Sequence, residues 1–202
     1  LMDGKEATML FTDPPYNVAF NGRSGNFDVI KNDDLSVDEF SDFINSFISI
    51  MSTLNISNYY ICCNWAFYGL LQLKLKPKAC IVWAKNVFGL GIGYRHQHEF
   101  ILFNGNIKKS IKNESDLWSI SRDTNYKHPT QKPVALSKRA IENTTNKGAL
   151  VLDLFGGSGS TLIAAEKSAR KCYMMELDPI YVDVIIQRWE NFTGKKAELT
   201  NG

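Results

Sequence analysis

Apolar, β-prone runs alternate with helical patterns along most of the chain, and this alternation limits the fold more than any other feature. Strands are predicted at residues 8–12, 59–64, 79–84, 99–104, 149–154 and 171–177. Helices are predicted at residues 37–53, 66–75, 133–146, 159–169 and 179–193. Alternating strands and helices favour a mostly parallel, twisted sheet with helices on both faces. The sequence therefore predicts an α/β fold.

The length of 202 residues suffices for one well-buried domain and is too short for two large ones. No apolar run approaches the roughly 20 residues that a membrane span needs, and no secretory signal follows Leu1. We expect a cytoplasmic protein, excised from a longer chain because it does not begin with Met. Reduced thiols are expected for the cysteines, which show no C-x-x-C spacing: Cys62, Cys63, Cys80 and Cys172.

The segment Thr12-Asp13-Pro14-Pro15-Tyr16-Asn17 directly follows the first predicted strand. A carboxylate, two rigid prolines and an aromatic ring at a strand end can hold an exocyclic amino group, whose lone pair is otherwise delocalised into its ring. Asp13 and the carbonyl of Pro14 can accept the hydrogens of the amine, and Tyr16 can stack on the ring. Taken alone, the segment fits a Pro-Pro turn with an Asp cap equally well.

A second motif, at residues 151–161, combines a strand, a glycine-rich turn and a helix start. Its glycines let the backbone pass close to a ligand, and the helix N-terminus offers free N–H groups. The next strand ends near Glu176, which follows Gly156 by about 20 residues, a spacing that fits a carboxylate on the ribose of an adenosine-containing cofactor. The alternative is a surface acid at the start of the last helix.

Lysine and arginine residues gather in the second half of the middle region, in a chain whose net charge is only +2. A nucleic-acid-binding protein concentrates such residues on one surface, although a solvated polar face has a similar sequence. The predicted DNA-binding residues are Lys108, Lys109, Lys112, Arg122 and Lys127.

Together with His128-Pro129-Thr130-Gln131-Lys132-Pro133, the two motifs resemble the S-adenosylmethionine-dependent DNA methyltransferases that modify exocyclic amines. Their order resembles the permuted beta class, in which the catalytic motif comes first and the cofactor loop last. The resemblance covers nearly the whole chain, with shorter matches at residues 32–34, 83–86 and 98–99. It implies a circularly permuted, Rossmann-like methyltransferase fold, S-adenosyl-L-methionine as cofactor, double-stranded DNA as partner, and base flipping. It also implies a protein encoded by a bacterium or phage.

The resemblance also assigns residues. Catalytic roles fall to Asp13, Pro14, Pro15 and Tyr16. Cofactor contacts fall to Asp13, His128, Thr130, Gln131, Lys132, Asp153, Phe155, Gly156, Gly157, Ser158, Gly159, Ser160, Glu176 and Asp178. It implies a single domain, with a catalytic region at 1–104, a target-recognition region at about 105–127 and a cofactor-binding region at 128–202. No metal is expected. Many beta-class members carry Asp-Pro-Phe and Ala-Gly-Ser-Gly-Thr at the cofactor loop; this chain departs from that pattern but retains Phe155 and the glycines.

The expected reaction is methyl transfer to the N6 amine of adenine, because resembling cytosine enzymes more often carry Ser at the position of Asp13. Transfer to cytosine N4 is the nearest alternative. Cytosine-carbon methylation requires a nucleophilic cysteine, which follows a proline in the enzymes that carry it out. The chain has no Pro-Cys pair, so this reaction is rejected. A protein or RNA amine methyltransferase is a further alternative, but in those enzymes the cofactor loop usually precedes the catalytic motif, whereas here it follows. The alternative of another class is a non-catalytic DNA-binding or cofactor-sensing module, and the intact residues 13–16 argue against it. The sequence leaves open the recognition sequence, an accompanying restriction endonuclease, a homodimer and an upstream domain.

Overall fold

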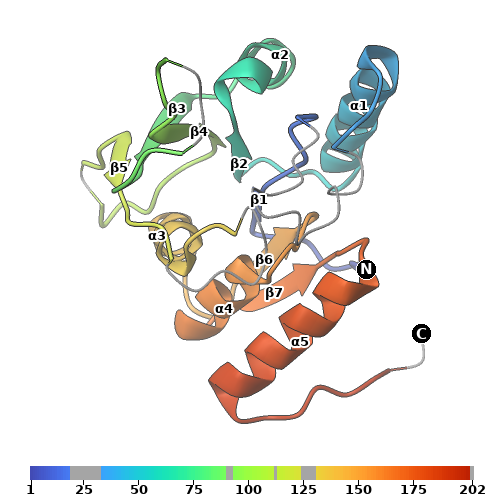
Figure 1. The fold of residues 1–202 in the computed structure, drawn as a ribbon. Coiled ribbons are helices and arrows are strands. Elements are labelled where there is room, and N and C mark those ends of the chain that lie inside the picture. Colours follow the sequence, from blue (N-terminus) through green and yellow to red (C-terminus); the bar gives the residue numbers. More distant parts are fainter. Residues whose placement is uncertain (19–32, 90–92, 112, 124–130, 201–202) are drawn as a thin grey trace.

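The computed structural model describes residues 1–18, 33–89, 93–111, 113–123 and 131–200, and their strands form one seven-stranded sheet (Figure 1). The strand order is β5-β3-β4-β2-β1-β6-β7. The strands are β1 (Met9–Thr12), β2 (Tyr59–Cys63), β3 (Ala79–Ala84), β4 (His98–Asn104), β5 (Leu117–Ser119), β6 (Leu150–Asp153) and β7 (Lys171–Met174). Strand β4 runs antiparallel to both of its neighbours, and the other paired strands are parallel. The predicted, mostly parallel α/β fold is confirmed.

Helices cover both faces of this sheet, as the sequence predicts. They are α1 (Val37–Thr53), α2 (Trp65–Leu75), α3 (Val134–Thr144), α4 (Ser160–Lys167) and α5 (Pro179–Thr193). The side chain of Ser36 accepts from the backbone N–H of Glu39, whose carboxylate in turn accepts from the backbone N–H of Ser36, and this capping box fixes the start of α1. No helix in the described ranges is long and apolar enough to cross a membrane.

The strands bury both of their faces, so that alternate side chains enter two separate cores. Met9 and Phe11 of β1 pack with residues of α3 and α4, such as Leu136 and Ala164. Leu10, between them in sequence, packs in the core that contains α1 and α2. Because both faces of the sheet are covered, these strands consist of continuous hydrophobic runs in the sequence.

The chain winds in opposite directions from the adjacent pair β1 and β6. The unit β1–α1–β2 extends the sheet towards β5, whereas β6–α4–β7 extends it to the opposite edge. Such a reversal opens a crevice beyond the carboxyl ends of the two strands, where α/β proteins bind ligands. Both conspicuous sequence motifs begin here, since Asp13 follows β1 and Asp153 ends β6.

Two elements differ from the sequence prediction by more than two residues at an end. Strand β5 is absent from the prediction, because three residues within a polar stretch give too short a pattern. Strand β7 ends at Met174 rather than at residue 177. The residues that follow turn towards the glycine-rich loop instead, where the carbonyl of Met175 accepts from the N–H of Gly156.

Two glycines with positive φ allow a test of the fold far from this crevice. A Cβ on Gly105 (φ +126°) would lie 2.2 Å from Oδ1 of Asn58, whereas one on Gly148 (φ +82°) would meet no described atom within 4 Å. We expect Gly148→Ala to lower the free energy of unfolding by about 1 kcal/mol through backbone strain. Gly105→Ala should lower the free energy of unfolding by clearly more, because the side chain of Asn58 must also move. Equal losses in urea denaturation would contradict this packing.

Candidate active site

Asp13 to Tyr16 lie at the carboxyl end of β1, where Pro14 is buried and the other three residues are partly exposed. The loop is fixed by the segment that precedes α1: the backbone N–H of Tyr16 donates to Oδ1 of Asp33 at 3.0 Å. Asn17 adopts φ of 55°, and its side chain bonds both backbone groups of Leu35. Asn tolerates this left-handed conformation better than most residues. The turn therefore holds the Asp13 carboxylate and the Tyr16 ring in defined positions.

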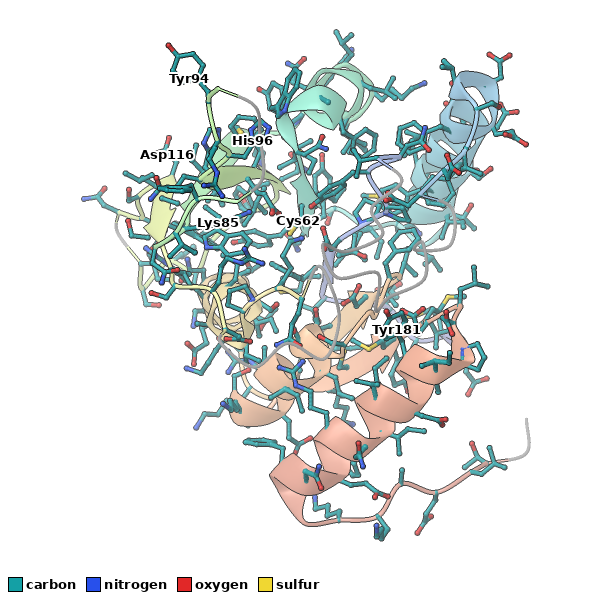
Figure 2. All side chains as sticks on the ribbon, viewed as in Figure 1. Cys62, Lys85, Tyr94, His96, Asp116 and Tyr181 are labelled. Carbon is teal, nitrogen blue, oxygen red and sulfur yellow. The ribbon has the colours of Figure 1, made fainter. Side chains whose placement is uncertain are left out.

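Three charged side chains from distant segments gather around Asp13. We call Asp13, Lys85, Glu99 and Lys132 the charged cluster. Nζ of Lys132 lies 2.5 Å from Oδ2 of Asp13 and 3.1 Å from Oε2 of Glu99. Nζ of Lys85 lies 2.5 Å from Oε1 of Glu99. The hydroxyl of Tyr16 donates to Oδ1 of Asp13 at 2.5 Å. Lys85 and Cys62 mark the position of this cluster in Figure 2.

Burial and neighbouring charges shift the pKa values of this cluster in opposite directions. Burial raises the pKa of Asp13, and the ammonium of Lys132 counteracts part of that rise. Burial would also raise the pKa of Glu99, but Lys132 and Lys85 together lower it to about 2. Burial alone would lower the pKa of Lys132, but the two carboxylates raise it above its ordinary value. Glu99 and Lys132 are therefore both charged at neutral pH.

Asp13 is the more accessible member of its ion pair. Its side chain is 21% exposed, against 8% for that of Lys132. A carboxylate has about four lone-pair positions, and Lys132 and Tyr16 use two of those on Asp13. An incoming amine can therefore donate to Asp13 without breaking either contact.

Lys132 also joins Asp13 to the glycine-rich motif. Its backbone carbonyl accepts from the hydroxyl of Ser160, the first residue of α4, at 2.7 Å. The neighbouring Gln131 donates to Oδ2 of Asp123 at 2.9 Å. One residue thus contacts both motifs, which are separated by more than half the chain.

The glycine-rich turn passes close to the end of β7. A Cβ on Gly156 would lie 2.8 Å from the side chain of Met174, and Gly159 adopts φ of +77° where α4 begins. The carboxylate of Glu176 accepts from the backbone N–H of Gly157 at 2.6 Å and of Asp178 at 2.9 Å. Two of its lone-pair positions remain for a ligand. This turn and carboxylate fit an adenosine-containing cofactor with ribose hydroxyls.

Other residues assigned to the cofactor support the turn itself. Oδ1 of Asp153 accepts from the hydroxyl of Thr12 at 2.8 Å and the N–H of Phe155 at 3.1 Å, which ties β6 to β1. Burial raises the pKa of Asp153 to about 7. The ring of Phe155 packs against α1, 5.7 Å from that of Phe47.

The last two assigned positions bond to α5. Asp178 caps this helix by accepting from the N–H of Ile180. The carbonyl and hydroxyl of Ser158 both accept from Arg188, each at 2.9 Å.

The predicted DNA-binding residues that the structure describes, Lys108, Lys109 and Arg122, do not come together. Asn104, at the end of β4, pairs with Tyr59, the first residue of β2, so the chain after it lies at the amino ends of the parallel strands. Lys108 and Lys109 belong to that edge, and the N–H of Lys108 bonds the carbonyl of Asn143 at the end of α3. Arg122 lies instead at the carboxyl edge, where its N–H bonds Asn86. Lys112, Lys127, His128 and Thr130 lie outside the described residues.

Sequence reasoning did not assign a role to Glu99, Lys85, Asp33 or Arg188, although the first three fall in short segments that match the resembling family. A charge at the edge of an apolar strand is the signal that could have found Lys85 and Glu99, since each borders a buried strand. Arg188 carries no such signal, because an arginine on an amphipathic helix is ordinary.

The chain matches known proteins along most of its length. The family model described as DNA methylase matches residues 104–188. YubD of Escherichia coli strain K12 is 32% identical over 184 residues, which cover 86% of this chain and 78% of YubD. The chain belongs to the DNA methylase family. The expected resemblance to S-adenosylmethionine-dependent DNA amino-methyltransferases is thereby confirmed.

Two further relatives illustrate the range of this similarity. The DNA adenine methyltransferase YhdJ of E. coli strain K12 is 36% identical over 88 residues, which cover 41% of this methylase and 30% of YhdJ. Among solved structures, the M1.HpyAVI–SAM complex has a TM-score of 0.68 and 26% identity, covering 91% of this methylase and 89% of the other chain. The Rossmann-like methyltransferase fold is confirmed by the second match.

Proposed function

We propose that this DNA methylase transfers a methyl group from S-adenosylmethionine to the N6 amine of adenine in double-stranded DNA. The observation that carries the proposal is the position of Asp13. Its carboxylate lies at the crevice between β1 and β6, and Lys132 connects it to the glycine-rich turn that fits a cofactor. An amine acceptor and a cofactor seat thus share one crevice.

S-adenosylmethionine is the cofactor of the family, and when bound it supplies a methyl group on a positively charged sulfur. We assign its seat to the backbone of Gly156, Gly157 and Gly159, with the Glu176 carboxylate on the ribose hydroxyls. The first turn of α4 adds N–H groups that attract the cofactor's own carboxylate. Asp153 and Phe155 act mainly by shaping this turn, because their groups already bond or pack within the protein. Ser158, Ser160 and Asp178 hold its two flanks.

Asp13 and Pro14 act on the amine. Two acceptors draw the amine hydrogens out of the ring plane, which makes the nitrogen lone pair available for attack. As the nitrogen gains positive charge, the adjacent Asp13 carboxylate stabilises that charge more than it stabilises the neutral amine. Lys132 and Glu99 fix the carboxylate in place, so little reorganisation is needed during the reaction.

Tyr16 supplies a stacking surface for the target base. Its ring lies 6.4 Å from that of Phe67, and Nζ of Lys132 lies 5.3 Å from its centroid. A base within a duplex cannot reach this crevice, so it must rotate out of the stack at a cost of a few kcal/mol. Stacking on Tyr16 offsets part of that cost, by about 1–3 kcal/mol.

Adenine is favoured over cytosine by two considerations. Asp at position 13 is the residue that resembling adenine enzymes carry, and the Tyr16 ring is covered more fully by a purine than by a pyrimidine. A relative named as an adenine methyltransferase, YhdJ, supports the same choice. Hydrogen bonding alone does not decide, since both bases offer an amine donor. Cytosine N4 therefore remains the second candidate.

The first prediction concerns Asp13. Asp13→Ala should lower the methyl-transfer rate by about 100-fold or more, because the acceptor for the developing charge is lost. Lys132 retains Glu99 as a partner, so the fold and the cofactor affinity should persist. Tritium-methyl transfer and calorimetric titration measure the two effects. Asp34→Ala, at an exposed acid nearby, is the matched control. Retained activity in Asp13→Ala would refute the catalytic assignment.

The second prediction concerns the product. Nucleoside mass spectrometry of DNA treated with the methylase and S-adenosylmethionine should detect N6-methyladenine. N4-methylcytosine as the sole product would overturn the choice of base, while leaving the cofactor seat and the role of Asp13 intact.

A further inference from the structure

The hairpin that joins β3 to β4 carries an unusual concentration of exposed rings. Tyr94 is 97% exposed, and Phe88 and Trp65, the first residue of α2, are both more than half exposed. Large apolar side chains that gather at a surface mark an interaction site. With Arg95 and His96, these residues form what we call the hairpin surface. Figure 2 shows Tyr94 pointing away from the rest of the protein.

The exposed groups are arranged in ordered pairs. The guanidinium of Arg95 lies 4.3 Å from the centroid of the Phe88 ring, and its Nε donates to the carbonyl of Gly89 at 2.9 Å. The ring of His96 stacks on that of Trp65 at 6.3 Å between centroids and 26° between planes. A backbone bond from the N–H of Gly89 to the carbonyl of His96, at 2.7 Å, holds the two pairs together.

This surface lies at the same edge of the sheet as Asp13. Phe100 of β4 pairs with Cys63, the last residue of β2, so the residues before Phe100 extend past the carboxyl ends of the parallel strands. Trp65 begins α2 two residues after β2 ends. The base of the hairpin supplies Lys85 and Glu99 to the charged cluster. The surface therefore lies at the carboxyl edge of the sheet and is joined to the charged cluster through the base of the hairpin.

The charge of the hairpin favours a polyanion. No acidic residue occurs from Lys85 to His98, whereas Arg95 and two histidines do. The longer basic stretch, by contrast, places Lys108 and Lys109 at the opposite edge of the sheet. Exposed rings interleaved with an arginine are the combination by which proteins stack on bases and contact the phosphates beside them.

We propose that the hairpin surface binds the DNA that flanks the target base, with Arg95 on a phosphate and Tyr94 stacked on an unpaired or unstacked base. The inference rests on the proposed function, and it assigns the contact to a hairpin outside the predicted target-recognition region. Rotation of the target base leaves a neighbour unstacked, and an exposed ring next to the crevice can cover it. Lys85 and Glu99, at the base of the hairpin, connect it to Lys132 and Asp13.

Fluorescence anisotropy with a short mixed-sequence duplex, over a series of NaCl concentrations, tests this surface. Arg95→Ala should weaken binding and reduce the salt slope by about one unit, the effect of one lost phosphate contact. Tyr94→Ala should weaken binding about 5- to 100-fold through lost stacking, with the salt slope unchanged. Lys147→Ala removes the same charge from the opposite edge, just before β6, and Phe192→Ala removes an exposed ring of α5. Both controls should bind as the wild type does.

The inference would be overturned by wild-type affinity and salt slope in Arg95→Ala and Tyr94→Ala, by equal losses in the controls, or by a wild type that does not bind the duplex. It would also be overturned if sedimentation showed a dimer that Tyr94→Ala dissociates while DNA affinity is unchanged, since the partner would then be a second copy of this chain. A wild type that binds DNA but transfers no methyl group would contradict the proposed function alone. Cofactor affinity, measured by calorimetry, should be unchanged in both variants and confirms that they fold.

Discussion

The position of Lys132 between Asp13 and Glu99 is the interaction on which the site depends. A carboxylate at the end of a buried strand loses hydration, and burial raises the pKa of Asp13 accordingly. Lys132 opposes that rise, and Glu99 keeps the ammonium in place with help from Lys85. Removal of the Lys132 ammonium would leave the Asp13 carboxylate without its charged partner, which costs several kcal/mol. The four residues should therefore be understood as one unit that presents Asp13 to a substrate.

The sheet topology explains why this unit lies where a cofactor can reach it. Because the chain winds away from β1 and β6 in opposite directions, the ends of both strands border one crevice. Thr12 and Asp153 bond across the two strands, and Ser160 bonds the backbone of Lys132. The glycine-rich turn is thus linked to the Asp13 segment both through Thr12 and through Lys132. In the same way, the β3–β4 hairpin connects the outer surface with Glu99.

Much of this arrangement could be predicted from the sequence, and the exceptions have physical reasons. Long periodic elements such as α1 were predicted with the observed bounds, because an amphipathic pattern with a capping box is locally determined. Strand β5 was missed, because its pairing with β3 is a tertiary contact that three residues cannot signal. The charged cluster was missed as a unit, since its members are far apart in sequence and meet only through the sheet. The basic stretch gave a single prediction, but Lys108 lies at the amino ends of the parallel strands and Arg122 at their carboxyl ends, because strand β5 runs between them.

The pH dependence of methyl transfer at saturating cofactor and DNA tests the central claim most directly. If the Asp13 carboxylate must be ionised and Lys132 lowers its pKa, then Lys132→Gln should move the rise in rate with pH to higher pH. Lys132→Arg, which keeps the charge, should leave that rise close to its wild-type position. A Lys132→Gln profile that begins to rise at the same pH as the wild type would contradict the account.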